Sequence, residues 1–163
     1  MQGSSAVYAL DTVGVWRSAQ GGASGSWVKL MKATADYKIL DGLAVDPASP
    51  TTVYVAAKGL GGVWRIEDAG GGAPRTQRIL ALKDAGPITV DAAGSLFAHD
   101  AGGSRLLQAT APRSATPSFT NVSDALYADN NHIRSLAIGP DGYVYTAANH
   151  AGVTVGVPST SAP

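Results

Sequence analysis

Eight residues in the second half of the chain have side chains suited to binding a ligand. They lie at the ends of short runs of strand-forming residues and are His99, Asp100, Tyr127, Asp129, Asn131, His132, Asn149 and His150. Amides and carboxylates hydrogen-bond to hydroxyl groups, and an aromatic ring supplies a flat apolar platform. We therefore predict a sugar-binding face from these residues. The alternative is an ordinary polar loop surface, since loops are generally polar.

No set of residues in the sequence points to catalysis or to a metal. The three histidines lack the spacing within one element that zinc ligands have, and the chain has no cysteine. The run Gly70–Gly72 lacks the lysine and helix of a phosphate-binding loop. We expect no catalytic residue, no metal and no cofactor. The many aspartates nevertheless leave open a pair of carboxylates at the spacing of a glycosidase.

The composition narrows the classes of partner. Twelve lysines and arginines balance twelve aspartates and glutamates, so we expect neither nucleic acid nor an anionic membrane as partner. No apolar run reaches the ~18 residues of a spanning helix, and the first residues lack the pattern of a signal peptide. An apolar content of 45% together with 20 glycines predicts a folded, turn-rich chain.

Strand-forming segments recur along the chain with a nearly constant period. Four apolar-aromatic segments begin at Val7, Val53, Leu96 and Val144, which are 46, 43 and 48 residues apart. Matching segments precede three of them, at 43–47, 88–92 and 136–140. Third segments follow at 14–17, 62–65, 105–107 and 152–155, and more polar fourth segments at 27–30, 76–80 and 119–122. The dipeptides Ala93-Gly94 and Asp141-Gly142 predict tight hairpin turns.

This period is typical of a four-stranded antiparallel blade. We predict an all-β fold of fourteen strands, forming about 3.5 to 4 β-propeller blades in one domain over residues 1–157. The blade units are 6–30, 43–80, 88–122 and 136–157, followed by a flexible tail at 158–163. A propeller hides its sheet edges by closing its ring. We therefore expect a homodimer through 6–17 and 136–157, or a piece of a longer propeller.

Alternating strand directions sort the loops onto two faces. Loops after the second and fourth strand of each blade share one face, which gathers the eight candidates with Asp36, Tyr37, Lys58, Asp84 and Asn130. The opposite face carries turns in which Asp46, Asp91 and Asp141 are expected to be structural. Trp16 and Trp64 occupy one repeat position and are expected to fill the space between blades.

Two segments resemble the repeat of the Asp-box propellers. Gly14-Val15-Trp16-Arg17-Ser18 and Gly62-Val63-Trp64-Arg65, the latter followed by Asp68-Ala69-Gly70-Gly71, are similar to bacterial neuraminidase repeats. That family includes sialidases, xyloglucanase-type glycosidases and sortilin-like receptors, and segment 43–55 looks like the strand before the box in xyloglucanase-type members. Neither copy has the full Ser-x-Asp-x-Gly-x-Thr-Trp box, and the second half of the chain looks more like the plainer repeat of other six-bladed propellers.

The resemblance implies a secreted or periplasmic protein, carbohydrate as partner and a structural turn at Asp68. A sialidase would need a tyrosine–glutamate pair, and the single glutamate, Glu67, falls in the box turn. The sequence therefore predicts a non-catalytic recognition or scaffold module, with carbohydrate as its ligand. The alternative is a fragment or small relative of an Asp-box glycoside hydrolase, completed by further blades or by a partner chain.

Overall fold

The protein is all-β in the part of the chain that its structure describes. The structure is a computed structural model that describes residues 6–34, 40–123, 133–148 and 152–156. These residues form fourteen strands in four antiparallel sheets and contain no helix. Within each sheet the strands are hydrogen-bonded in chain order. Each sheet is therefore a meander of consecutive hairpins.

The four sheets follow one another along the chain. The first sheet contains β1 (Val7–Asp11), β2 (Gly14–Ser18) and β3 (Trp27–Lys32). The second contains β4 (Leu40–Asp46), β5 (Ser49–Ala57), β6 (Gly62–Glu67) and β7 (Arg75–Leu80). The third contains β8 (Ala85–Val90), β9 (Leu96–Asp100), β10 (Arg105–Ala109) and β11 (Thr120–Asn121). The fourth contains β12 (Ile133–Ile138), β13 (Val144–Ala148) and β14 (Gly152–Gly156).

The all-β prediction and its fourteen strands are confirmed, because each predicted segment coincides with one observed strand. The hairpin prediction is also met: Gly94 and Gly142 have φ angles of 87° and 79°, the left-handed region that a tight turn requires of one residue. The differences lie at strand boundaries, and the largest is the start of β5 at Ser49 rather than Val53. β4 begins at Leu40 rather than Leu43, and β11 is shortened to two residues.

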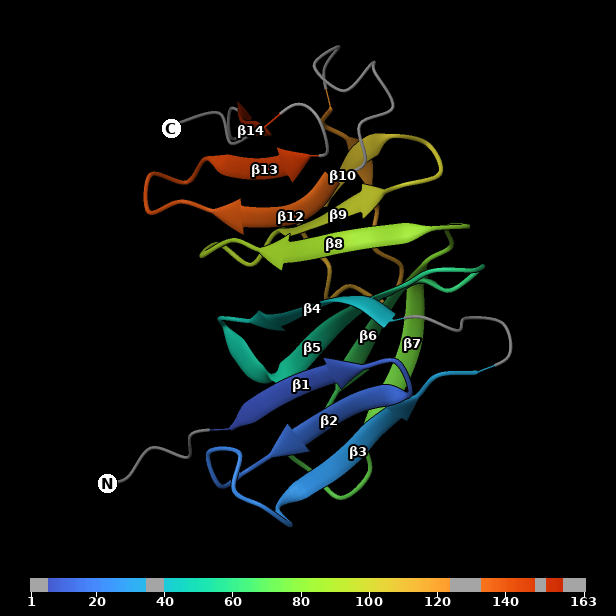
Figure 1. The fold of residues 1–163 in the computed structure, drawn as a ribbon, viewed down its shortest axis with the longest axis vertical. Coiled ribbons are helices and arrows are strands. Elements are labelled where there is room, and N and C mark those ends of the chain that lie inside the picture. The colour runs from blue at the N-terminus through green and yellow to red at the C-terminus, as the bar shows by residue number, and fades with distance from the viewer. Residues whose placement is uncertain (1–5, 35–39, 124–132, 149–151, 157–163) are drawn as a thin grey trace.

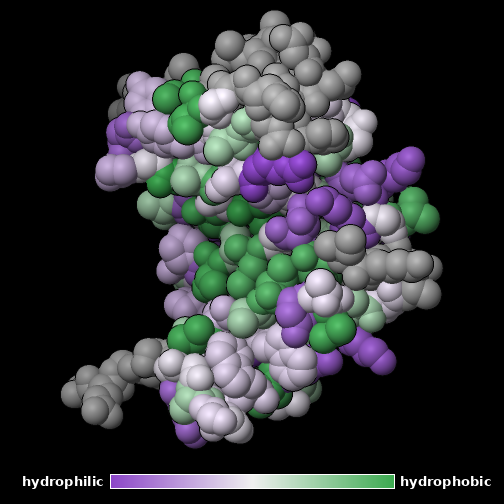
Figure 2. Space-filling view, in the orientation of Figure 1, coloured by the Kyte–Doolittle hydropathy of each residue, from purple (hydrophilic) through white to green (hydrophobic). Residues whose placement is uncertain are grey.

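The sheets pack against one another in chain order, from the first at the bottom of Figure 1 to the fourth at the top. The first strands of the second, third and fourth sheets lie side by side, β4 against β8 and β8 against β12. Figure 2 shows hydrophobic residues gathered over the middle of the same view, where β4 and β8 lie.

Three apolar clusters fill the spaces between successive sheets. Residues of the first and second sheets form one cluster around Val15 and Val55, and the second and third sheets share another around Val63 and Leu96. Phe97, Leu106 and Val144 join the third and fourth sheets. Each fully buried side chain of this size contributes roughly 1.5–3 kcal/mol. The sheets are therefore stabilised mainly by their neighbours.

Strand alternation decides which neighbour each side chain of β6 meets. Val63 belongs to the cluster shared with the third sheet, and Arg65 donates to the carbonyl oxygens of Pro112 and Ser114 in the third sheet's β10–β11 loop. Ile66 and Trp64 pack toward the first sheet instead. Successive side chains of a strand point to opposite faces, so β6 contributes to both interfaces.

The two tryptophans at the same repeat position behave differently. Trp64 packs against the first cluster as predicted, and its Nε1 donates to the Gly61 carbonyl at 2.8 Å. Trp16 is half-buried and packs against none of the three described clusters, so it does not fill a space between two described sheets of the chain. Its ring lies 4.3 Å from the ammonium of Lys29, and Nε1 donates to Asp11 Oδ2. No described sheet lies beyond this face of the first sheet.

The aspartates predicted to be turn residues do shape turns. Asp46, Asp91 and Asp141 accept backbone N–H bonds from Ala48, Ser95 and Tyr143 at 2.9, 2.7 and 3.1 Å. Asp68 lies between β6 and β7 with φ 54°, and its carboxylate pairs with Arg75 at 3.0 Å. Its turn role is thus observed.

Candidate ligand-binding site

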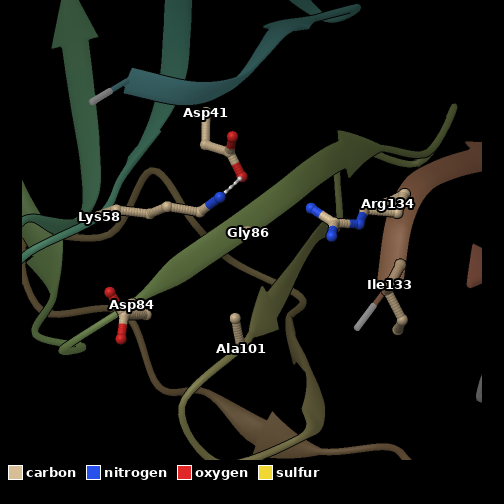
Figure 3. A pocket seen from close by; sticks show the side chains of 7 residues that line it. All are labelled: Asp41, Lys58, Asp84, Gly86, Ala101, Ile133 and Arg134. Atoms are coloured by element: carbon tan, nitrogen blue, oxygen red, sulfur yellow. Dashed lines mark ion pairs between the residues drawn. The ribbon is translucent and has the colours of Figure 1, made fainter. Parts of the chain in front are cut away.

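A pocket of about 430 Å³ opens at one end of the second, third and fourth sheets. It is lined by Asp41, Lys58, Asp84, Gly86, Ala101, Ile133 and Arg134. Figure 3 shows the Asp41–Lys58 ion pair on one side of β8 and Arg134 extending from β12 on the other. We call this end of the sheets, with loop residues 58–61, 81–84 and 101–104, the pocket end.

The same backbone irregularity recurs where the first strands of the second, third and fourth sheets line this pocket. The pairing register shifts between Leu40 and Gly42 in β4, between Ala85 and Ile88 in β8, and between Ile133 and Ser135 in β12. A β-bulge re-aims the side chain at the irregular position and is frequent beside functional sites.

The irregular positions are equivalent in the repeat and carry different residues. Asp41, Gly86 and Arg134 each stand two residues before the matching apolar residues Leu43, Ile88 and Leu136. All three line the pocket. One repeat position therefore supplies a carboxylate, an open stretch of backbone and a guanidinium to the same cavity.

Backbone bonds between loops fix the pocket rim. Lys58 forms an isolated bridge with Asp84, and Leu60 N donates to the Lys83 carbonyl at 2.7 Å. Asp84 accepts from Ala101 N through its carbonyl and from Gly59 N through Oδ1, at 2.9 and 3.3 Å. Asp84 therefore ties the second and third sheets together while lining the pocket.

Gly86 is required by close packing behind the pocket. A Cβ atom on Gly86 would lie 2.6 Å from Nδ1 of His99, closer than real Cβ contacts come. The imidazole of His99 is 1% exposed and lies against this stretch of β8. A side chain at position 86 would thus displace His99.

The pocket offers donors and acceptors of both charges. Lys58 Nζ and Asp41 Oδ2 are 3.0 Å apart, and their side chains are 34% and 29% exposed. Carboxylates accept hydrogen bonds, whereas ammonium and guanidinium groups donate them, so a hydroxyl-rich ligand could bond to both kinds of group. The lining of two aspartates, a lysine and an arginine has no net formal charge.

Of the eight residues predicted to bind ligand, the structure describes His99 and Asp100, and neither lies in an exposed loop as predicted. His99 and Asp100 are the last residues of β9 and are buried, so neither presents a side chain on an exposed loop. Asp100 accepts from Gly103 N and Arg105 Nε, both at 3.1 Å, and so shapes the β9–β10 turn. The other six lie outside the described residues: Tyr127, Asp129, Asn131, His132, Asn149 and His150.

The repeat itself indicates both the burial of His99 and the equivalence of the three pocket positions. His99 stands at the repeat position of Ala56, since Ala56 pairs with Val63 as His99 pairs with Leu106, and Ala56 is fully buried. Asp41, Gly86 and Arg134 are equally equivalent by alignment of the repeats. The loop positions of Lys58 and Asp84 predict the face on which the pocket opens.

The described residues contain no group of three histidine, cysteine, aspartate or glutamate side chains that could hold a metal ion. They also contain no helix long and apolar enough to cross a membrane.

Comparison with known proteins gives similarity of fold. No family model matches the chain, and no curated protein does. The extracellular domain of a one-component system from B. thetaiotaomicron is 14% identical with a TM-score of 0.66, over 93% of this chain and 20% of that one. A second structure from that bacterium, an extracellular domain described as part of a hybrid two-component system, is 11% identical with a TM-score of 0.65, over 96% and 20%.

A third similar structure comes from a nidogen/laminin complex. It is 18% identical with a TM-score of 0.62, over 86% of this chain and 51% of that chain. The present chain thus spans about a fifth of the two bacterial chains that it matches. These likenesses support the arrangement of strands and sheets, and the chemistry of the site is argued from its own residues.

Proposed function

We propose that the four sheets are blades of a β-propeller and that the chain is a non-catalytic recognition module with a carbohydrate-binding pocket. The observation that carries this proposal is the shared position of Asp41, Gly86 and Arg134. These residues occupy the same position in three successive repeats, each beside a shift in strand register, and all three line one pocket. The residue type differs from repeat to repeat.

The sheet arrangement supports a propeller. Each sheet is a meander, and the first strands of three sheets lie together, as the innermost strands of blades do. The resemblance to Asp-box repeats belongs to the same proposal, and the turn at Asp68 between the third and fourth strands of its sheet agrees with it.

Carbohydrate is favoured by the polar character of the pocket. Sugars are bound through planar amides, carboxylates and guanidinium groups that bond to vicinal hydroxyls. The matched bacterial domains are extracellular. We extend that location to this chain, which agrees with a secreted or periplasmic module.

Glycan-array screening followed by calorimetry with the best-bound oligosaccharide tests the proposal. Arg134→Gln should weaken binding at least tenfold, because loss of a charged hydrogen bond costs about 1.5–3 kcal/mol. Arg75→Gln is the matched control, since Arg75 is 72% exposed and lies away from the pocket. Absence of any bound glycan, or equal weakening by both variants, would reject the proposal.

A glycoside hydrolase is the second candidate, because Asp41 and Asp84 line the same pocket. A pair of carboxylates can serve as acid and as base or nucleophile in glycoside hydrolysis. Release of reducing ends from xyloglucan or a related β-glucan, abolished by both Asp41→Asn and Asp84→Asn, would favour this candidate. Binding without hydrolysis would favour the recognition module.

A further inference from the structure

The outer face of the fourth sheet repeats a buried face of the second sheet residue for residue. The second sheet presents Ala44, Tyr54, Ala56 and Val63 to the third sheet, and all four belong to or pack against the cluster between them. The fourth sheet has Ala137, Tyr145, Ala147 and Val153 at the equivalent positions. The cross-strand partners also match: Ala44 pairs with Tyr54 as Ala137 pairs with Tyr145. Ala56 likewise pairs with Val63 as Ala147 pairs with Val153.

The two faces differ greatly in exposure. Val63 is fully buried, as is Val15 at the same position of the first sheet, and Leu106 in the third sheet is 4% exposed. Val153 is 71% exposed. The first three sheets are followed by another sheet, whereas no described strand packs on this face of the fourth.

The strand residues on the outer face of the fourth sheet are also uncharged, and the Tyr145 hydroxyl among them donates to the Asp141 carboxylate in the β12–β13 turn. Cross-strand partners and alternate residues share a face of a sheet. This face therefore carries Ser135, Ala137, Tyr145, Ala147, Val153 and Val155. Val155, at the position of the buried Arg65, is 48% exposed. Exposed apolar residues that lie side by side, as Val153 and Val155 do on one face of β14, are typical of interaction surfaces.

The first sheet carries the matching half of such a contact. Val53, Val55 and Trp64 of the second sheet pack toward the first sheet. Their equivalents in the first sheet are Val7, Ala9 and Trp16, since Ala9 pairs with Trp16 as Val55 pairs with Trp64. Val7 is 37% exposed, and Trp16 is half-buried.

We propose that the fourth sheet of one copy packs on the first sheet of a second copy, head to tail. The contact reproduces the packing of each sheet on the next one within the chain. Two such contacts would join two copies of this chain into a closed ring of eight sheets, four from the described residues of each copy. A head-to-tail contact gives either a ring or an open filament, and eight blades lie within the usual range of about 4–8 for propellers.

Light scattering coupled to size-exclusion chromatography, over a wide range of concentration, tests this inference. The wild-type protein should have the mass of two chains. Val153→Asp should reduce the mass to one chain, because it places a charge in an apolar contact. Val28→Asp is the matched control and should stay at two chains: Val28 is 62% exposed but lies across from Arg17, on the opposite side of the first sheet from Trp16.

Variants of the first sheet distinguish head-to-tail packing from pairing of like faces. Trp16→Glu should also have the mass of one chain. Mixing the Trp16→Glu and Val153→Asp proteins should restore a two-chain species, because the unaltered fourth sheet of the former can pack on the unaltered first sheet of the latter. Circular dichroism checks folding, and Val7→Asp replaces Trp16→Glu if that variant is unfolded. A single-chain wild type, a mass above two chains, or a Trp16→Glu protein that remains a dimer would overturn the inference.

Discussion

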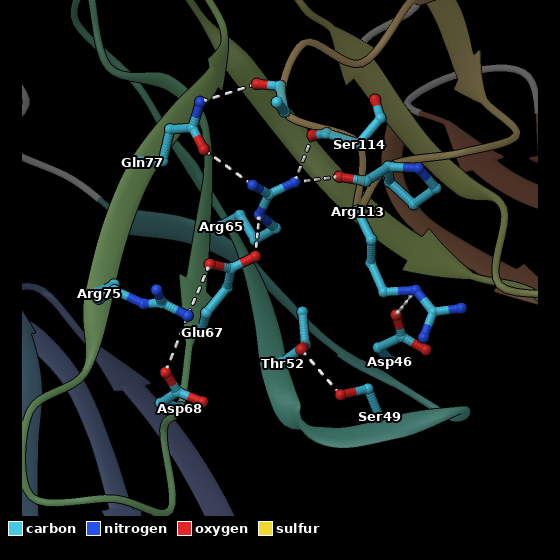
Figure 4. Close-up of polar contacts among 12 residues, drawn as sticks. Asp46, Ser49, Thr52, Arg65, Glu67, Asp68, Arg75, Gln77, Arg113 and Ser114 are labelled. Carbon is cyan, nitrogen blue, oxygen red and sulfur yellow. Dashed lines mark hydrogen bonds and ion pairs between the residues drawn. The ribbon is translucent and has the colours of Figure 1, made fainter.

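The two ends of the second and third sheets contain charged groups of very different character. At the end opposite the pocket, which we call the turn end, Arg65 is 3% exposed and contacts four groups. Its Nη1 donates to Pro112 O and Ser114 O, and Nη2 donates to Gln77 Oε1, each at 2.8 Å (Figure 4). Its Nε lies 3.1 Å from Glu67 Oε1.

Asp46 is the acidic counterpart at the turn end. It is fully buried, 3.5 Å from Arg113 Nε of the third sheet, and accepts a 3.4 Å bond from the Tyr54 hydroxyl. Burial, reinforced by this carboxylate, raises the pKa of Tyr54. At the pocket end, by contrast, Asp41 and Lys58 form a partly exposed pair beside a cavity. Buried charges with several partners therefore join the second and third sheets, whereas the charges at the pocket end remain accessible and would bind the ligand that we propose.

Removing the turn-end cation should have the largest effect on stability. Arg65→Met should lower the free energy of unfolding by about 3–5 kcal/mol, because it leaves the carbonyl oxygens of Pro112 and Ser114 without their donor and takes from Glu67 its buried partner. Urea denaturation measures the loss. Arg75→Met, whose side chain is 72% exposed, should cost less than about 1 kcal/mol. Similar losses for the two variants would contradict the buried role of Arg65.

Filling the backbone space behind the pocket should have the next largest effect. Gly86→Ala should cost about 1–3 kcal/mol, since its Cβ would lie 2.6 Å from His99 Nδ1 and force the imidazole to move. Thermal unfolding of the variant measures this. Gly72→Ala is the control, because a Cβ there has no neighbour within 4 Å. A Gly86→Ala protein as stable as the parent would mean that His99 moves at little cost.

Neutralising a pocket carboxylate should barely affect stability. Asp41→Asn should cost less than about 1 kcal/mol, because its ion pair with Lys58 is partly exposed. Asp46→Asn at the turn end should cost about 1–3 kcal/mol, since a buried group loses its partners. Urea denaturation of both proteins, with glycan binding measured in parallel, compares the two ends. Asp41→Asn should lower binding, and the reverse order of stabilities would refute the comparison.

The sequence predicted the strands better than the site because the two depend on different information. Strand order follows from a period that is visible in segments such as Val53–Ala56 and Val144–Ala147. The pocket depends on bulges at Asp41 and Arg134, which are properties of pairing between strands and have no residue signature of their own. The polarity of His99 favours a loop, whereas its repeat position, which is that of Ala56, predicts a buried strand residue.

The smallest expected effect concerns an aspartate–tyrosine pair that occurs twice at the turn end. The hydroxyl of Tyr145 donates to Asp141 Oδ2 at 2.8 Å in the fourth sheet, where the pair is exposed, whereas Tyr54 and Asp46 form the buried pair of the second sheet. The bond from Tyr145, followed by that from Tyr143 N, lowers the pKa of Asp141, and the same carboxylate raises the pKa of Tyr145.

A carboxyl whose pKa is lowered by folding stabilises the protein above its unfolded pKa, and this stabilisation is lost as the pH falls through the folded pKa. NMR titration of the Asp141 carboxyl carbon should therefore give a pKa below that of an ordinary aspartate. Tyr145→Phe should raise this pKa and leave Asp11 unchanged, since the pKa of Asp11 is lowered chiefly by its bond from Val13 N. An Asp141 pKa that does not move in Tyr145→Phe would show that the exposed pair, unlike the buried one, is not formed in solution.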